Sequence, residues 1–204
     1  MKKIVLTLAV ILGLGCFQLN AQTTVSGGIK AQLNLSNFLI SDINASKSTM
    51  GFGPTLGGFM KVEFNENFAL QPELLFHFKT SETKLEGAKN DYEYWGMEIP
   101  VYAVGQMKLG EGKGYIGVGP YVGFGFDAKW SKGNNNNLYK EYDGRKSFMS
   151  RWDFGVGAIV GYEMDNGVSV NAGYQIGLID VLEANKDNAS MRTQTVSLGV
   201  GYKF

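Results

Sequence analysis

The stretch YIGVGPYVGFGFD, residues 115–127, sets the pattern from which the rest of the sequence is interpreted. Every even position carries an apolar residue, whereas the odd positions carry glycine, tyrosine or aspartate. The even positions are Ile116, Val118, Pro120, Val122, Phe124 and Phe126. Because successive side chains of a β-strand point to opposite faces, the stretch predicts a strand with one apolar face and one face of small and polar residues.

The same two-residue alternation recurs along the chain and predicts eight strands. The expected strands span residues 24–36, 51–64, 68–81, 93–109, 114–128, 150–164, 168–180 and 191–204. The last of them alternates up to Phe204. No segment in this region keeps an amphipathic helical period, so the sequence predicts an all-β fold.

Short and long connections alternate between these strands. The short polar turns lie at 65–67, 110–113 and 165–167, and the longer polar loops at 37–50, 82–92, 129–149 and 181–190. In an antiparallel up-and-down arrangement, all short turns fall at one end and all long loops at the other. This is the layout of an eight-stranded transmembrane β-barrel with short periplasmic turns and long extracellular loops.

The first 21 residues resemble a secretory signal peptide. Lys2 and Lys3 precede an apolar run at residues 4–17, and Ala21 provides a small residue at an expected cleavage site. The run is shorter than the ~20 residues of a transmembrane helix. We therefore expect a signal peptide at 1–21 and a barrel domain at 22–204; lipidation of Cys16, the only cysteine, is the alternative processing route.

Charge and glycine content narrow the function classes. There are 19 basic and 19 acidic residues, so no basic surplus favours nucleic acid as a partner. Glycine reaches 28 of 204 residues, about twice the usual ~7%. The glycines gather on the polar faces of the predicted strands, as expected where eight strands enclose a narrow interior.

Periodicity alone is compatible with two kinds of closed barrel. A lipocalin-like soluble barrel turns its apolar face inward around a ligand, whereas a membrane barrel turns it outward to lipid. Strands of about a dozen residues suit a tilted membrane span, and aromatic residues stand near strand ends on the apolar face, as in an interfacial girdle. These aromatic residues are Phe64, Phe68, Trp95, Phe126, Trp152, Tyr162 and Tyr202. Together with the glycine distribution, they favour the membrane barrel.

Four segments resemble the PorT-like outer-membrane β-barrel family of Bacteroidetes-type bacteria. They are MEIPVY at 97–102, GVGPYVG at 117–123, FGVGA at 154–158, and GYQIGL at 173–178 with Asp180. The resemblance implies an integral barrel of OmpA-like size in the outer membrane of a Gram-negative bacterium, in contact with outer-membrane lipid. It further implies a link to type IX secretion, with which the family's namesake is associated. The terminal Tyr202-Lys203-Phe204 resembles the aromatic signal used by the barrel-insertion machinery, with Phe204 as the contact.

Charged residues on the polar face are expected to fill the lumen. The candidate lumen network comprises Lys30, Lys61, Glu73, His77, Glu98, Arg151 and Asp153. Because buried charges are costly when unpaired, Glu73 and Glu98 are expected to pair with lumen lysines or with Arg151. His77 is the only histidine, which excludes a site with several imidazoles. The sequence predicts no catalytic, metal or cofactor site.

The third long loop carries the candidate surface contacts Trp130, Tyr139, Tyr142 and Arg145. This loop also contains four consecutive asparagines at 134–137, so it is either simply solvated or an adhesive surface for an extracellular glycan or protein. The sequence therefore predicts a non-catalytic outer-membrane barrel with a structural or surface-interaction role. The alternatives are a soluble periplasmic ligand-binding barrel and a small outer-membrane enzyme acting on lipid.

Overall fold

The computed structural model describes residues 23–41, 47–85, 88–130, 138, 139, 147, 149–181 and 190–204, and every structural statement below concerns these residues. The signal peptide expected at 1–21 lies outside them. Among the described residues, no helix has the length and apolar character needed to cross a membrane.

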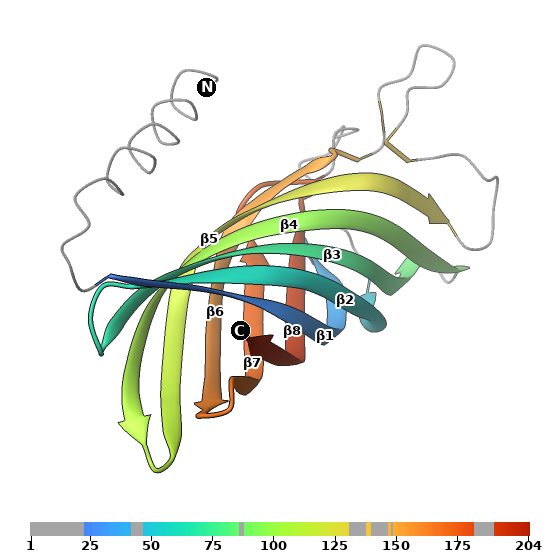
Figure 1. Ribbon diagram of the computed structural model, residues 1–204. Helices are drawn as coiled ribbons and strands as arrows, with labels where there is room; N and C mark the ends of the chain where they lie inside the picture. The colour runs from blue at the N-terminus through green and yellow to red at the C-terminus, as the bar shows by residue number, and fades with distance from the viewer. Residues whose placement is uncertain are drawn as a thin grey trace, which may run out of the picture.

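The described strands form one closed antiparallel barrel in chain order, and the first strand pairs with the last (Figure 1). They are β1 (Thr24–Ser41), β2 (Lys47–Glu63), β3 (Phe68–Leu85), β4 (Ala88–Leu109), β5 (Gly112–Trp130), β6 (Trp152–Met164), β7 (Val168–Gly177) and β8 (Ser190–Lys203). The predicted eight-stranded up-and-down barrel is confirmed.

The register fixes the width of the barrel. A path through paired residues leaves β1 at Leu35 and returns to β1 at Val25, ten residues earlier. It runs through Val196, Tyr174, Ala158, Val118, Ala103, Leu70 and Val62. With eight strands, such a stagger corresponds to a strand tilt of about 40° and an interior just wide enough for side chains.

Three short turns lie at one end of the barrel, which we call the turn end; the opposite end is the loop end (Figure 1). Between β2 and β3, Asn65 Oδ1 accepts the backbone N–H groups of Asn67 and Phe68 at 2.9 and 2.8 Å. Gly110 and Gly167 adopt φ values of 64° and 85° in the other two turns. A left-handed backbone of this kind favours glycine, and the predicted turns are confirmed.

Several strands extend further toward the loop end than predicted. β3 continues to Leu85 and β4 begins at Ala88, so nearly all of the loop expected at 82–92 is paired strand, with Ser81 opposite Tyr92. β1 and β2 likewise extend into the loop expected at 37–50. The alternation test missed these extensions because it requires one apolar face, and strand segments such as SETKL at 81–85 carry polar residues at most positions.

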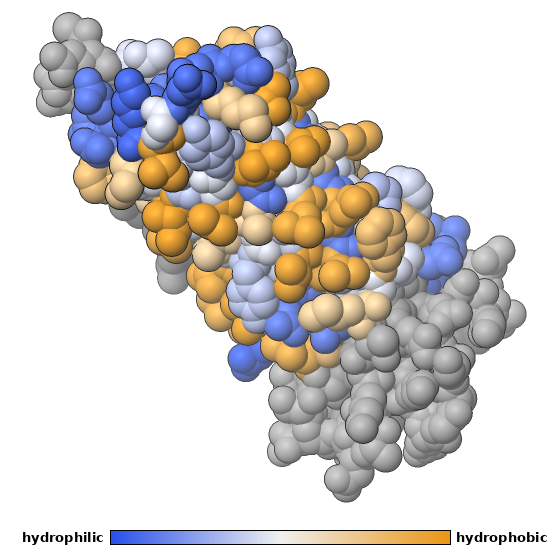
Figure 2. Space-filling model, turned by 90° about the horizontal axis from the view of Figure 1, so that it is seen from below, coloured by the Kyte–Doolittle hydropathy of each residue, from blue (hydrophilic) through white to orange (hydrophobic). Residues whose placement is uncertain are grey.

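The apolar face points outward. Ile29, Leu56, Ile116 and Leu198 are each more than 60% exposed, and Figure 2 shows apolar side chains gathered on the wall between the two ends of the barrel. A lipocalin-like barrel would bury these side chains around a ligand, so this alternative is excluded.

Aromatic side chains form two rows on the outer wall. The row near the turn end contains Phe64, Phe68, Tyr162, Tyr202 and Phe204, and the row near the loop end contains Phe52, Phe78, Trp95, Phe126, Trp152 and Phe154. Ten residues separate Phe68 from Phe78 on β3. At the rise and tilt of a barrel strand, this is about 25 Å along the barrel axis, which is the height of the lipid-facing band of an outer-membrane barrel.

Glycines on the inner face make room for buried tyrosines. A Cβ added at Gly161 would lie 2.5 Å from Cζ of Tyr115, and one added at Gly155 would lie 2.5 Å from Cε1 of Tyr121. Both tyrosines are buried. These two glycines therefore leave space for tyrosine rings that lie across neighbouring strands inside the lumen.

Candidate functional site: the barrel lumen and its two ends

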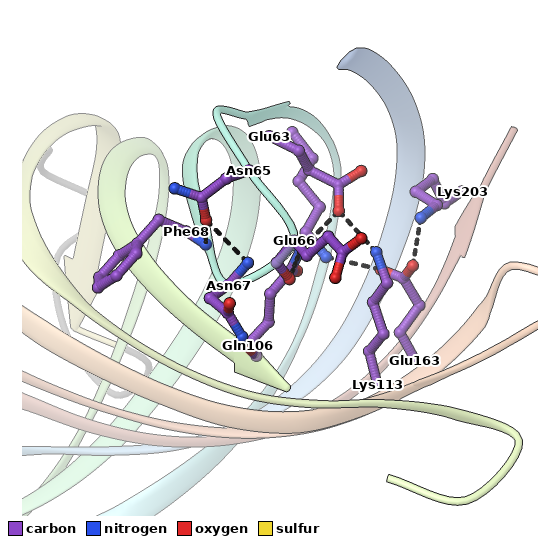
Figure 3. A network of polar contacts seen from close by, with 10 residues as sticks. Glu63, Asn65, Glu66, Asn67, Phe68, Gln106, Lys113, Glu163 and Lys203 are labelled. Atoms are coloured by element: carbon purple, nitrogen blue, oxygen red, sulfur yellow. Dashed lines mark hydrogen bonds and ion pairs between the residues drawn. The ribbon is translucent and has the colours of Figure 1, made fainter. Parts of the chain in front are cut away.

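A polar network spans the lumen at the turn end (Figure 3). Glu63 Oε1 accepts hydrogen bonds from Lys113 Nζ at 2.9 Å and from Gln106 Nε2 at 2.6 Å. Glu163 pairs with Lys203 and, at 2.9 Å, with Lys61. Because these residues come from β2, β4, β5, β6 and β8, the network joins strands around the barrel and pairs the charges at this end.

The middle of the lumen holds a fully buried ion pair. Lys30 Nζ lies 2.9 Å from both carboxylate oxygens of Glu73, and Gln71 Nε2 donates to Glu73 Oε1 at 2.8 Å. The side chains of Lys30 and Glu73 are 3% and 0% exposed. With three donor contacts on its carboxylate, Glu73 is compensated in the way that a buried charge requires.

Nearer the loop end, Glu98 forms an ion pair with Lys79, and His77 Nδ1 lies 3.6 Å from Glu98 Oε1. This distance exceeds that of a hydrogen bond, and His77 Nδ1 has no hydrogen-bond partner in the described part of the chain. The imidazole packs edge-on against Tyr94 with ring centroids 5.4 Å apart. His77 is therefore enclosed in the lumen beside an ion pair that is complete without it.

Asp153 and Arg151 do not pair with each other or with the lumen carboxylates and lysines. Asp153 Oδ2 accepts hydrogen bonds from Tyr121 at 3.1 Å and from Thr193 at 2.7 Å, and its Oδ1 has no partner among the described residues. Arg151 Nη1 instead donates to the backbone oxygens of Gly125 and Phe126, each at 3.2 Å. Of the two kinds of partner expected for Glu73 and Glu98, the lysines rather than Arg151 pair with them, because Arg151 Nη1 is bound to backbone oxygens at the strand end.

An apolar cap covers the lumen at the loop end. Its buried members are Phe38, Ala128, Met149, Val181 and Met191, and Tyr94, Leu138 and Tyr139 pack against them. Backbone hydrogen bonds attach the covering segments to the strand ends: Leu138 N donates to Ala128 O at 2.9 Å, and Val181 N to Met191 O at 3.0 Å. The cap thus includes pieces of the third and fourth long connections.

Tyr139 belongs to this cap. Its ring lies under the Arg151 guanidinium, 5.2 Å from Cζ to the ring centroid, and its hydroxyl would be 2.3 Å from a Cβ added at Gly125. The sequence had suggested a free loop contact for Tyr139; packing against apolar neighbours directs it inward instead. Tyr142 and Arg145 lie outside the described residues, as does the side chain of Trp130.

Two cavities inside the lumen are small. One, of about 30 Å³, lies below the cap and is bordered by His77, Glu98 and Asp153. The other, of about 10 Å³, lies near Glu73 and Tyr102. Such volumes hold roughly one or two water molecules. Within the described part of the chain, no group of three or more His, Cys, Asp or Glu side chains has the arrangement of a metal site.

Most of the predicted lumen residues lie inside the barrel, between the turn end and the cap. Lys30, Lys61, Glu73, His77 and Glu98 are all buried on the inner face, and Glu73 and Glu98 pair with lysines as expected. Sequence reasoning missed the cap, whose members come from strand ends and loops. The apolar Met149 and Val181 within otherwise polar connections were the available signal.

The family described as outer membrane protein beta-barrel domain matches residues 7–204. The search of curated proteins gives no match.

Solved structures of membrane barrels are similar to this chain at low sequence identity. Neisserial surface protein A shares 15% identity over 89% of this chain and 99% of its own, with a TM-score of 0.50. Ail, the attachment invasion locus protein of Yersinia pestis, in complex with the heparin analogue sucrose octasulfate, shares 15% identity over 88% and 99%, with a TM-score of 0.47. The outer membrane enzyme PagL shares 12% identity over 84% and 98%, with a TM-score of 0.45.

Proposed function

Because this chain belongs to the family of outer membrane protein β-barrel domains, and so lies in the outer membrane of a Gram-negative bacterium, we propose that it is a closed, non-catalytic barrel. Its role is to form part of the membrane wall and to present its long connections at the cell surface. The observation that carries this proposal is the sealed lumen, with charges paired from the turn end to the middle and an apolar cap at the loop end.

The sealed lumen supports a structural role over transport. A solute would have to break the Lys30–Glu73 and Lys79–Glu98 pairs and displace the cap, because the two cavities below the cap and near Glu73 accommodate only water. Separating a buried ion pair leaves two uncompensated charges in the interior, which is unfavourable. The pairs therefore oppose opening of the lumen.

We expect purified protein in planar bilayers to show no reproducible unitary conductance. The full chain should be inserted from detergent at neutral pH and recorded over several hundred millivolts of applied voltage. Gly125→Trp, which would displace Tyr139 from the cap, provides a comparison for leaks created by loss of the cap. Regular single-channel steps in the unmodified protein would refute the closed barrel.

An enzyme acting on lipid is the alternative function. His77 and Glu98, its candidate reactive pair, are both about 5% exposed and lie inside the barrel below the cap, whereas lipid contacts the outer wall. A lipid ester would have no described route to them. Lipid cleavage in vesicles that His77→Ala or Glu98→Gln abolishes would overturn the non-catalytic proposal.

The surface role is proposed for the third long connection, with Trp130, Tyr142 and Arg145 as contacts for a glycan or protein. We further propose, from the segments at 97–102 and 117–123, that the chain is a PorT-like member of its family with a link to type IX secretion. The proposed contact with the insertion machinery is supported by Phe204, whose side chain is 75% exposed on the outer wall.

Trypsin added to intact cells should cleave after Lys132, Lys140 or Arg145 and spare Lys113. The first three lie in the connection assigned to the cell surface, and Lys113 lies at the turn end. Mass spectrometry of the released peptides identifies the cut sites, and lysed cells provide the control in which Lys113 is accessible. Cleavage confined to Lys113 in intact cells would show that the topology is inverted.

A further inference from the structure

The aromatic row near the loop end is interrupted on one side of the barrel. Each strand from β2 to β6 contributes a ring to it: the ring centroids of Phe78 and Trp95 are 4.7 Å apart, and Phe124, which contacts Phe126 of the row, lies 4.9 Å from Trp152. On the described parts of β8 and β1, the outward positions of the same region carry Gln194, Arg192 and Asn37 instead. This sector therefore presents polar groups at a level where β2 to β6 present rings.

The polar groups of the interruption lie on neighbouring strands. Asn37 pairs in register with Gln194, and Leu39 with Arg192. Gln194 Nε2 donates to the hydroxyl of Tyr174 on β7 at 2.8 Å, and Asn37 Oδ1 has no hydrogen-bond partner among the described residues. Asn37 Oδ1 is buried, so what the cluster offers at the outer surface is N–H donors, with part of its hydrogen-bonding capacity unused.

Arg192 supplies the charge of this cluster. Its side chain is exposed and forms no ion pair with any residue that the structure describes. The nearby Asp180 Oδ1 is bound instead to the backbone N–H of Met191 at 3.0 Å. An exposed guanidinium at the edge of the lipid-facing band is suited to a phosphate group, which it binds with two parallel hydrogen bonds.

An apolar groove runs below the cluster on the same strands. It has a volume of about 550 Å³ and is lined mainly by Ala31, Leu33, Pro54, Leu56, Val170, Leu198 and Val200, from β1, β2, β7 and β8. Ala31 forms a low floor between Leu56 and Val200, its register neighbours. On β8, six residues separate Arg192 from Leu198, about 20 Å along the strand. A single long-chain lipid can span this distance.

We propose that the outer wall formed by β7, β8 and β1 binds one phosphorylated lipid of the outer leaflet, with its phosphate on Arg192, its polar linkage on Asn37 and Gln194, and an acyl chain in the groove. The charge of Arg192 selects an anionic headgroup, and the groove selects an attached chain over free phosphate. The site is independent of whether the lumen is closed, so failure of either proposal leaves the other standing.

Native mass spectrometry of the full chain in detergent tests the site with three probes: phosphatidic acid, phosphatidylcholine and inorganic phosphate. We expect one phosphatidic acid to be retained in preference to phosphatidylcholine, and no retention of inorganic phosphate. Arg192→Gln should weaken phosphatidic acid binding roughly fivefold to tenfold. Ala31→Phe, which fills the floor of the groove, should weaken it without altering the charge.

Lys129→Gln provides the matched control. Lys129 lies at the loop end of β5, is 44% exposed and pairs with Asp127. Lys129→Gln therefore removes one positive charge on a strand that does not line the groove. Equal losses in Arg192→Gln and Lys129→Gln would reduce the effect to general electrostatics and overturn the site. The site would also be overturned if phosphatidylcholine were retained as well as phosphatidic acid, or if both site variants bound phosphatidic acid unchanged. A lipid-free dimer that Ala31→Phe dissociates would overturn it too, because the groove would then hold a second copy of the chain.

Discussion

Lys30→Met is expected to lower the free energy of unfolding by about 3–5 kcal/mol, because it leaves Glu73 charged, buried and without a cation. The Glu73 side chain has no exposed surface, and its remaining donor is the Gln71 amide at 2.8 Å. Methionine retains the length and apolar stem of lysine, so the change removes mainly the charge. Urea unfolding of the barrel in lipid vesicles, followed by tryptophan fluorescence, measures the loss.

The double variant Lys30→Met/Glu73→Leu should recover most of this stability, because replacing both members of a buried pair by apolar side chains is often neutral or stabilising. Lys113→Met is the exposed counterpart: Lys113 pairs with Glu63 at the same 2.9 Å, but its side chain is 38% exposed. Solvent screening limits such a pair to about 1 kcal/mol or less. Equal losses in Lys30→Met and Lys113→Met would show that burial does not set the value of these pairs.

The strands and turns were predictable because each face of the wall meets one environment. Lipid requires apolar residues such as Ile116 and Val118 on the outside, and the narrow lumen requires small or polar residues such as Gly117 between them. Beyond the lipid-facing band this constraint ends. The paired residues at 81–85 and 88–92 therefore have no pattern that separates a strand from a loop.

The identity of the ion-pair partners could not be predicted. Lys30 and Glu73 lie on β1 and β3, with β2 between them, and their meeting depends on the stagger of the strands. Lys30 is in register with Gly57 on β2, so the intervening strand has no side chain at the position paired with Lys30. Only the three-dimensional register relates these three residues.

The cap was unpredictable for a different reason. Tyr139 and Met149 lie in a polar, asparagine-rich connection, and the sequence pattern of such a segment says nothing about which side chains return to the barrel. Their burial follows from apolar side chains at the strand ends, Phe38 and Met191, which need cover from the segments above them. The sequence thus predicted the wall and the residues of the lumen, but neither their pairing nor the closure above them.

Gly161→Val is expected to destabilise the barrel by about 3 kcal/mol, because the lumen beside it is already filled. A Cβ at this position would lie 2.5 Å from Cζ of Tyr115 and 2.6 Å from the backbone oxygen of Val170. The ring can turn away only by leaving the place where Lys61 Nζ lies 5.5 Å from its centroid, and the backbone oxygen cannot move without distorting the β6–β7 pairing. The loss should appear both in the unfolding free energy and as a smaller fraction of folded, heat-modifiable protein on gels.

Gly105→Val is the matched control for this variant, since a Cβ at Gly105 would meet nothing nearer than Ile116 O at 4.0 Å. There the new side chain extends into lipid, where an apolar group is favourable, and we expect a change within about 0.5 kcal/mol. Gly161→Ala should fall between the two, because one methyl group meets the same atoms with less bulk. If both valine variants lost equal stability, the cost would come from the loss of glycine itself, and the inner glycines could not be explained by the tyrosines that pack over them.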